Sequence, residues 1–164
     1  MTTPRFLKFV PFILTWEGEV YENDPDDNGG ATKYGIDQRS HPKEDIRNLT
    51  KERAYEIYFE EYWSRCRCEE LPVSVGEVVM NIAVNCGPGR AGKWLQQAVS
   101  ATPDGVIGPK TIAAAKLASP THLANDLIDR TEEHYRSIGR GKLAKFLKGW
   151  LNRNNSLRKW LNVN

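Results

Sequence analysis

The hydrophobic residues at the start of the chain recur at the spacing of a helix. In residues 5–17, apolar side chains follow one another at three- and four-residue steps, which predicts an amphipathic helix. Pro11 should kink this helix or delay its start, because proline lacks a backbone N–H and clashes with the preceding turn. Gly18 is a suitable stop. The chain therefore opens with a helix that ends at Glu17.

Helical spacing continues through the rest of the chain. Thr50 can cap a helix that runs from Lys51 to about Cys66 and is unusually aromatic. Pro72 opens a helix that is apolar on nearly all sides, as expected of a central buried helix. Further helices are expected at residues 90–99, from Pro109 onward, at 121–138, and as two short helices around 143–150 and 157–161.

Length and composition agree with a small helical protein. The 164 residues suit one domain, or one compact fold with two lobes, and the 40% of hydrophobic residues can form a core. No alternating run of hydrophobic and polar residues supports a sheet core, so the expected fold class is all-α. No stretch approaches the roughly twenty apolar residues of a membrane span, so no stable membrane insertion is expected.

The charges nearly balance, with a formal net charge of +2. This balance excludes neither an anionic nor a neutral polymer as partner, and no nucleic acid partner is expected. Basic residues crowd the end of the chain, where they can form a solvated helix face or attract the anionic bacterial envelope. They are Arg136, Arg140, Lys142, Lys145, Lys148, Arg153, Arg158 and Lys159.

The cysteines predict neither disulfides nor a metal site. Their odd number, at positions Cys66, Cys68 and Cys86, does not suggest a disulfide framework. A zinc site needs about four ligands, and the three histidines are scattered. Reduced structural thiols fit folding in a cytosol. Cys66 with His134 as a nucleophilic pair is an alternative without local support, and no cofactor is expected.

The segment with candidate chemistry is WEGEVYENDPDDNGGATKYGI, residues 16–36. Asp26 lies nine residues after Glu17, and Thr32 another six. Glycoside hydrolysis needs one protonated acid and a second group that manages a water or stabilises an oxocarbenium-like carbon. A helix C-terminus and the neighbouring Trp16 both favour a protonated Glu17, as a general acid requires. The alternative is a solvated glutamate followed by an acidic turn, since Asn, Asp, Pro and Gly are common turn formers.

The pattern E-G-x-V-Y-x-N-D-P-D-D-x-G-G-A-T-x-Y-G-I resembles the N-terminal signature of glycoside hydrolase family 108, the bacterial and phage N-acetylmuramidases. That family usually has glycine where this chain has Glu19. The spacing of Glu, eight residues, Asp, five residues and Thr also resembles the catalytic triad of phage-type lysozymes. The resemblance implies a lysozyme-like helical fold with a small β-hairpin within residues 19–36.

The same resemblance implies roles for individual residues. Glu17 would be the catalytic acid, and Asp26 and Thr32 would hold the nucleophilic water. Asp24 and Asp27 stay as rivals of Asp26. Substrate contacts are expected from Tyr34, Gln38 and Asp24. The aromatic residues of the helix from Lys51 are expected mostly in the core, with Trp63 as the residue that could line a saccharide cleft.

The second half carries its own resemblance. Residues 81–98 and 104–111 resemble the predicted peptidoglycan-binding region that accompanies family 108 domains. The expected division is therefore a catalytic region at 1–86 and a peptidoglycan-binding region at 87–164. The alternative is that the second half forms the second lobe of one lysozyme-like body, because no Pro/Gly/Ser-rich linker separates the halves.

The expected function is a peptidoglycan hydrolase, a lysozyme that cleaves the β-1,4 bond from N-acetylmuramic acid to N-acetylglucosamine by general acid catalysis with inversion. Three alternatives stay open. A non-catalytic wall-binding protein would use the acids only as turn formers. A lytic transglycosylase also uses one glutamate but needs no second carboxylate. A secretion accessory protein would open the wall locally.

The first apolar stretch also bears on location. It is interrupted by Lys8 and Pro11 and lacks a small-residue cleavage site, so it does not read as a signal peptide. We therefore expect synthesis in the cytoplasm and action in the periplasm or cell wall. Export would follow another route, through a phage holin or a dedicated secretion system.

Overall fold

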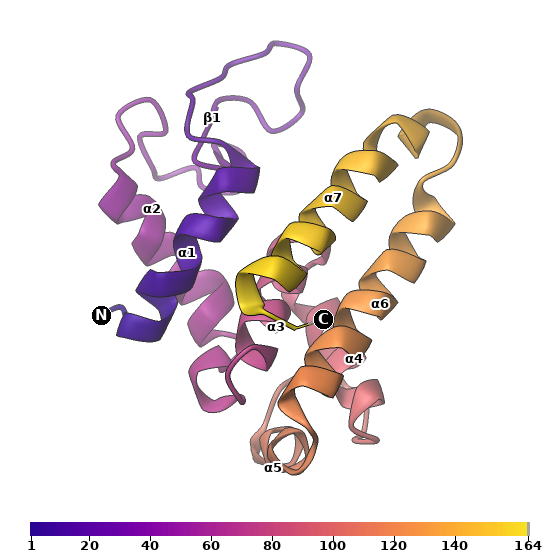
Figure 1. Cartoon of the computed structure of the whole chain (residues 1–164). Helices are drawn as coiled ribbons and strands as arrows, with labels where there is room; N and C mark the ends of the chain where they lie inside the picture. Colours follow the sequence, from indigo (N-terminus) through magenta and orange to yellow (C-terminus); the bar gives the residue numbers. More distant parts are fainter. Residues whose placement is uncertain (164) are drawn as a thin grey trace. The chain divides into compact units, whose positions relative to one another are not determined.

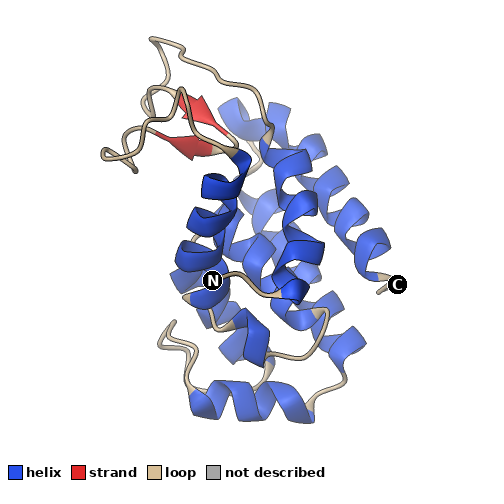
Figure 2. Cartoon of the chain, turned by 90° about the vertical axis from the view of Figure 1, so that its left-hand side faces the viewer, coloured by secondary structure: helices blue, strands red, loops and turns tan. Residues whose placement is uncertain are grey.

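The computed structural model describes residues 1–163, which form helices and one small hairpin in two compact units. Met1–Glu61 make the first unit, and the second begins at Tyr62. Figure 1 follows the elements along the chain, and Figure 2 shows the strands in a loop-rich part of it. The mainly helical class predicted from the sequence is confirmed. The elements are α1 (Pro4–Glu17), β1 (Thr32–Lys33), β2 (Ile36–Asp37), α2 (Lys51–Tyr58), η1 (Phe59–Ser64), η2 (Cys68–Glu70), α3 (Val75–Cys86), α4 (Pro88–Ala98), α5 (Pro109–Leu117), α6 (Pro120–Ile138), η3 (Gly141–Leu143) and α7 (Ala144–Leu161).

Helix α1 ends at Glu17 as predicted, and it begins at Pro4 and continues through Pro11, so Pro11 does not delay its start. The side chain of Thr3 caps the helix by accepting a hydrogen bond from the Phe6 N–H at 3.3 Å. Pro11 lies on the exposed side of the helix. The carbonyl that loses its N–H partner there belongs to Leu7, which is 44% exposed, so water can hydrate it. The opposite face of α1 is buried, and its packing stabilises the helix. The buried residues are Phe6, Phe9, Val10, Phe12, Ile13 and Leu14.

The predicted hairpin is present at the end of the acidic loop. Strands β1 and β2 are antiparallel, with Thr32 opposite Asp37. Tyr34 and Gly35 connect them with φ values of 54° and 75°. Two positive φ values in a two-residue loop are typical of a type I′ turn, the turn that matches the twist of paired strands. Glu22 extends the ladder, because its backbone exchanges hydrogen bonds of 2.8 and 2.7 Å with Thr32.

The helix predicted from Lys51 to about Cys66 begins as expected but changes type. Thr50 caps α2 through its side chain, which accepts from the Arg53 N–H at 3.2 Å. From Phe59 the chain continues as the π-helix η1. Tyr58 at the end of α2 and Trp63 in η1 are both buried.

Helix α3 is the central helix of the second unit. It begins at Val75, three residues later than predicted from Pro72, and every residue from Val75 to Ala83 is buried. It packs against α4 and α6. The boundary between the compact units falls at Glu61 and Tyr62, so α3 belongs to the second unit together with the helices that it contacts. The division expected after residue 86 falls between α3 and α4, within this second compact unit.

Helix α7 is one continuous helix where the sequence predicted two short ones. Figure 1 shows α6 and α7 as neighbours joined by a turn. The polar run that suggested a break contains Arg153 and Asn154, both buried. The Arg153 Nε donates a 2.9 Å hydrogen bond to the Asn81 Oδ1 of α3. The polar residues between 150 and 157 therefore lie within a continuous helix, where Arg153 forms a buried hydrogen bond, and not in the loop that the sequence predicts.

Among residues 1–163, no helix combines the length and the apolar character needed to cross a membrane. The described part of the chain also contains no cluster of three metal-ligating side chains. The three cysteines are not joined by disulfides. No hydrogen bond joins Cys66 to His134 within these described residues; His134 accepts from Arg90 and packs against Trp94.

Candidate active site

Glu17 is the last residue of α1 and is half-buried. Gly18 follows with φ 85°, and its N–H donates to the Leu14 carbonyl at 2.9 Å, which closes the helix. The chain then leaves in a loop, and Figure 2 shows the strands next to the end of this helix. The carboxyl group of Glu17 is therefore carried by the last residue of a helix, directly before the acidic loop begins.

The hairpin turn packs directly on the side chain of Glu17. A Cβ atom built on Gly35 would lie 2.7 Å from the Cβ of Glu17 and 3.1 Å from its Cγ. It would also lie 2.5 Å from the hydroxyl oxygen of Tyr58. Such distances are far inside van der Waals contact, so only glycine fits at this position. The absence of a side chain at Gly35 lets the turn approach the helix end.

Tyr58 of α2 fixes the same turn from the other side. Its hydroxyl donates a 2.7 Å hydrogen bond to the Tyr34 carbonyl, and its side chain is 2% exposed. Buried hydroxyls that are paired in this way restrict the geometry of the groups around them. Glu17, Gly35 and Tyr58 thus bring together the end of α1, the hairpin turn and α2.

The three acids of the loop differ in what their carboxylates do. The Asp24 Oδ1 accepts the Asp26 N–H at 2.9 Å, and the Asp27 Oδ1 accepts the Gly29 N–H at 2.8 Å. Both are Asx turns, which shape the loop. The exposed Asp26 carboxylate has no hydrogen-bond or ion-pair partner among the described residues. Asp26 is therefore the acid of the three whose carboxylate takes no part in shaping the loop.

Thr32 lies on β1 of the hairpin whose turn contacts Glu17. Its backbone is fully used by the pairing with Glu22. Among the described residues, the hydroxyl of Thr32 makes a single, long contact of 3.4 Å with the Gly30 carbonyl. A hydroxyl at that distance forms a weak bond at best, so the Thr32 side chain keeps its capacity to bind a water.

The side chains predicted to contact the substrate differ in their exposure and in their hydrogen bonds within the protein. Gln38 uses its amide nitrogen within the protein, donating to the carbonyls of His41 at 3.0 Å and Glu44 at 2.9 Å. Tyr34 is half-buried, and the Lys33 ammonium lies 5.3 Å from its ring centroid. Trp63 is 1% exposed and donates from Nε1 to the Glu69 carboxylate at 2.9 Å. A side chain with so little accessible surface cannot stack on a sugar, which corrects the prediction for Trp63.

One ion pair tethers the segment that follows Glu17. The Lys51 ammonium lies 3.0 Å from the Glu19 carboxylate, and this hydrogen bond raises the pKa of Lys51. Glu19 occupies the position where the resembling family usually has glycine. Both side chains are about half exposed, so the pair contributes little to stability. It anchors the start of the loop to α2.

Comparisons with known proteins bear on this site. The family described as glycosyl hydrolase 108 matches residues 10–87, and the family described as a predicted peptidoglycan domain matches residues 90–155. The chain is similar to the solved structure of Brucella abortus SagA, with 34% sequence identity and a TM-score of 0.81. That similarity covers 96% of this chain and 94% of SagA. No curated protein matches. The first family match contains the helix end, the acidic loop and the hairpin described above.

Proposed function

We propose that this chain is an N-acetylmuramidase. It belongs to the glycosyl hydrolase 108 family and is a lysozyme-like, mainly helical peptidoglycan hydrolase. It would cleave the β-1,4 bond from N-acetylmuramic acid to N-acetylglucosamine. The observation that carries this proposal is the close packing of Gly35 on Glu17. A general acid must be held within hydrogen-bond reach of the glycosidic oxygen, and this contact restricts where the carboxyl can lie.

Glu17 acts in this proposal as the general acid. Its proton passes to the glycosidic oxygen as the bond to the muramic acid carbon breaks. Asp26 accepts a proton from the attacking water, and Thr32 helps to hold that water. The free carboxylate of Asp26 and the weakly engaged hydroxyl of Thr32 support these roles.

The reaction is tested by analysis of the products released from purified peptidoglycan. We expect fragments that end in reducing N-acetylmuramic acid, because water is the acceptor in a hydrolysis. Anhydromuramyl ends would identify a lytic transglycosylase instead, and reducing N-acetylglucosamine ends would identify a different bond. Mass spectrometry of fragments with and without borohydride reduction separates the three results.

Asp26→Asn should lower kcat by about tenfold to a thousandfold, because an amide cannot take the proton of the attacking water. The matched controls are Asp24→Asn and Asp27→Asn. Asparagine keeps the side-chain oxygen that accepts the backbone N–H in each Asx turn, so these variants should stay within about threefold of the wild type. Turnover on purified peptidoglycan measures the difference. A larger loss in Asp24→Asn or Asp27→Asn than in Asp26→Asn would reassign the second carboxylate.

The first product formed should have the inverted, α configuration. A direct attack by water requires carboxyl groups roughly 6.5–9.5 Å apart, whereas a covalent retaining route needs about 5–5.5 Å. The spacing of Asp26 and Thr32 in the sequence, which resembles that of lysozymes that use a water directly, favours the first route, because a hydroxyl and a carboxylate together can hold a water. Proton NMR of the earliest product decides the point. Initial appearance of the β-anomer would exclude inversion.

A further inference from the structure

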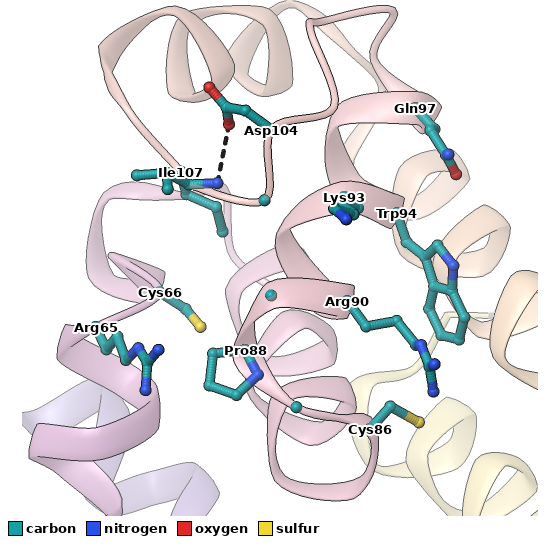
Figure 3. A pocket seen from close by; sticks show the side chains of 14 residues that line it. Arg65, Cys66, Cys86, Pro88, Arg90, Lys93, Trp94, Gln97, Asp104 and Ile107 are labelled. Carbon is teal, nitrogen blue, oxygen red and sulfur yellow. Dashed lines mark hydrogen bonds between the residues drawn. The ribbon is translucent and has the colours of Figure 1, made fainter.

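The second unit contains a cavity of about 750 Å³ on one face of α4. Arg90, Lys93, Trp94 and Gln97 line it, at the spacing i, i+3, i+4 and i+7 that places side chains on one helix face. Figure 3 shows this face together with Arg65, Cys66 and the loop at Asp104 and Ile107. The opposite face of α4 is buried. The helix thus presents two cations, an indole and an amide to an open cavity.

The wall opposite this face is rigidly attached to α4. The buried Gln96 amide donates to the Asp104 carboxylate at 2.8 Å and to the Val106 carbonyl at 2.9 Å, and its oxygen accepts the Gly105 N–H at 2.8 Å. Gly92 allows the close approach, because a Cβ there would lie 2.4 Å from the Gly105 carbonyl oxygen. The cavity is therefore formed before any ligand binds.

The charges of the lining residues are unbalanced. Arg65, Arg90 and Lys93 line the cavity, and none has an acidic partner among the described residues. Asp104 is the acid in the lining, and its Oδ1 accepts the Val106 N–H at 2.9 Å as well as the Gln96 amide. These bonds lower the pKa of Asp104 and keep its carboxylate turned to the loop. Three cations are left to attract an anionic ligand.

Arg90 is also oriented. Its Nη1 donates to the Nε2 of His134 at 3.2 Å. Burial and the charge of Arg90 lower the pKa of His134, so the imidazole is neutral and can accept this bond. Trp94 packs edge to face on the same imidazole, with ring centroids 5.3 Å apart. The guanidinium of Arg90 and the indole of Trp94 therefore both contact the imidazole of His134, and both extend from α4 in the same direction (Figure 3).

We propose that this cavity binds the carboxylate-bearing peptide stem of peptidoglycan, an assignment that rests on peptidoglycan as the substrate. The glycan strand itself consists of neutral sugars wherever the lactyl group is amidated by a stem, whereas the stem carries free carboxylates. Arg90 and Lys93 pair with those carboxylates, and the exposed part of Trp94 covers the apolar parts of the peptide. The second unit would thus select peptide-substituted strands for hydrolysis.

The test is calorimetric binding of a muropeptide, N-acetylglucosaminyl-N-acetylmuramic acid with a tetrapeptide stem, to the full chain. This ligand contains no bond from N-acetylmuramic acid to N-acetylglucosamine, so it is not cleaved during the measurement, and substitution of cavity residues distinguishes binding in the cavity from binding at the hydrolytic site. We expect it to bind at least about tenfold more tightly than the same disaccharide after enzymatic removal of the peptide. Arg90→Gln and Lys93→Gln should each weaken the binding of the muropeptide by about tenfold.

Lys110→Gln is the matched control, because it removes an exposed cation on α5 outside the cavity and should change the affinity by less than about twofold. Thermal melts check that each variant is folded. Equal affinity for the disaccharide with and without its peptide would overturn the proposal, as would unchanged binding by folded Lys93→Gln. Preferential binding of a glycerol phosphate polymer would overturn it in favour of a phosphate ligand. If the chain hydrolyses peptidoglycan normally but does not bind the muropeptide, only the inference about the cavity is overturned. If it binds the muropeptide but releases no muramidase products, only the proposed reaction is overturned.

Discussion

Glu17→Gln should lower kcat on purified peptidoglycan by about a hundredfold or more, with little change in the melting temperature. The amide has the size and shape of the carboxyl but no proton to give to the leaving oxygen, and general acid catalysis contributes about a hundredfold to ten-thousandfold. The groups that Gly35 approaches are the Cβ and Cγ of Glu17, and glutamine keeps both. Release of soluble fragments over time, measured beside a thermal melt, separates loss of catalysis from loss of fold.

Glu19→Gln is the matched control for this variant. It makes the same chemical change two residues away, on a side chain that is 54% exposed and paired with Lys51. Breaking such a surface pair costs little, so activity should stay within about threefold of the wild type. Glu17→Gln with activity within about threefold, in a folded protein, would show that another group supplies the proton.

The sequence predicts the parts of the site that depend on local pattern. The apolar spacing of residues 5–17 and Gly18 place Glu17 at a helix end, and the structure has the helix end at that residue. Turn-forming residues predict the acidic loop, and a two-residue turn at Tyr34 and Gly35 closes the hairpin. Each of these features is determined by residues close together in the chain, and such features are the ones that periodicity and turn chemistry can reveal.

The remaining features depend on contacts between distant residues. No local pattern shows that Gly35 packs on Glu17 or that Tyr58 donates to the Tyr34 carbonyl 24 positions away. The change from α-helix to π-helix at Phe59 is not visible in the aromatic run after Lys51, so the spacing does not show that Trp63 is buried. The sequence names Asp26 with Asp24 and Asp27 as rivals, and it does not predict that the latter two accept backbone N–H groups of the loop whereas Asp26 does not.

Gly35→Ala should lower both stability and activity, although it adds only one methyl group. Alanine at φ 75° is strained by about 1–2 kcal/mol. The new methyl would also lie 2.7 Å from the Glu17 Cβ and 2.5 Å from the Tyr58 hydroxyl oxygen, so the turn must move away from the helix end. A shift of about 1 Å at a catalytic group can cost about a hundredfold in rate. We expect a destabilisation of about 2–4 kcal/mol in urea unfolding and a loss of activity of at least about tenfold.

Gly30→Ala isolates the contact with Glu17 from the strain of the backbone. Gly30 has nearly the same φ, 73°, but the nearest atom to its added Cβ would be the Gln38 Cβ at 3.9 Å, an ordinary contact. This variant should therefore lose about 1–2 kcal/mol of stability from backbone strain and keep most of its activity. If Gly35→Ala and Gly30→Ala lose the same activity, the packing of the turn on Glu17 does not position the acid. A loss confined to Gly35→Ala ties the placement of the proton donor to a glycine that has no catalytic chemistry of its own.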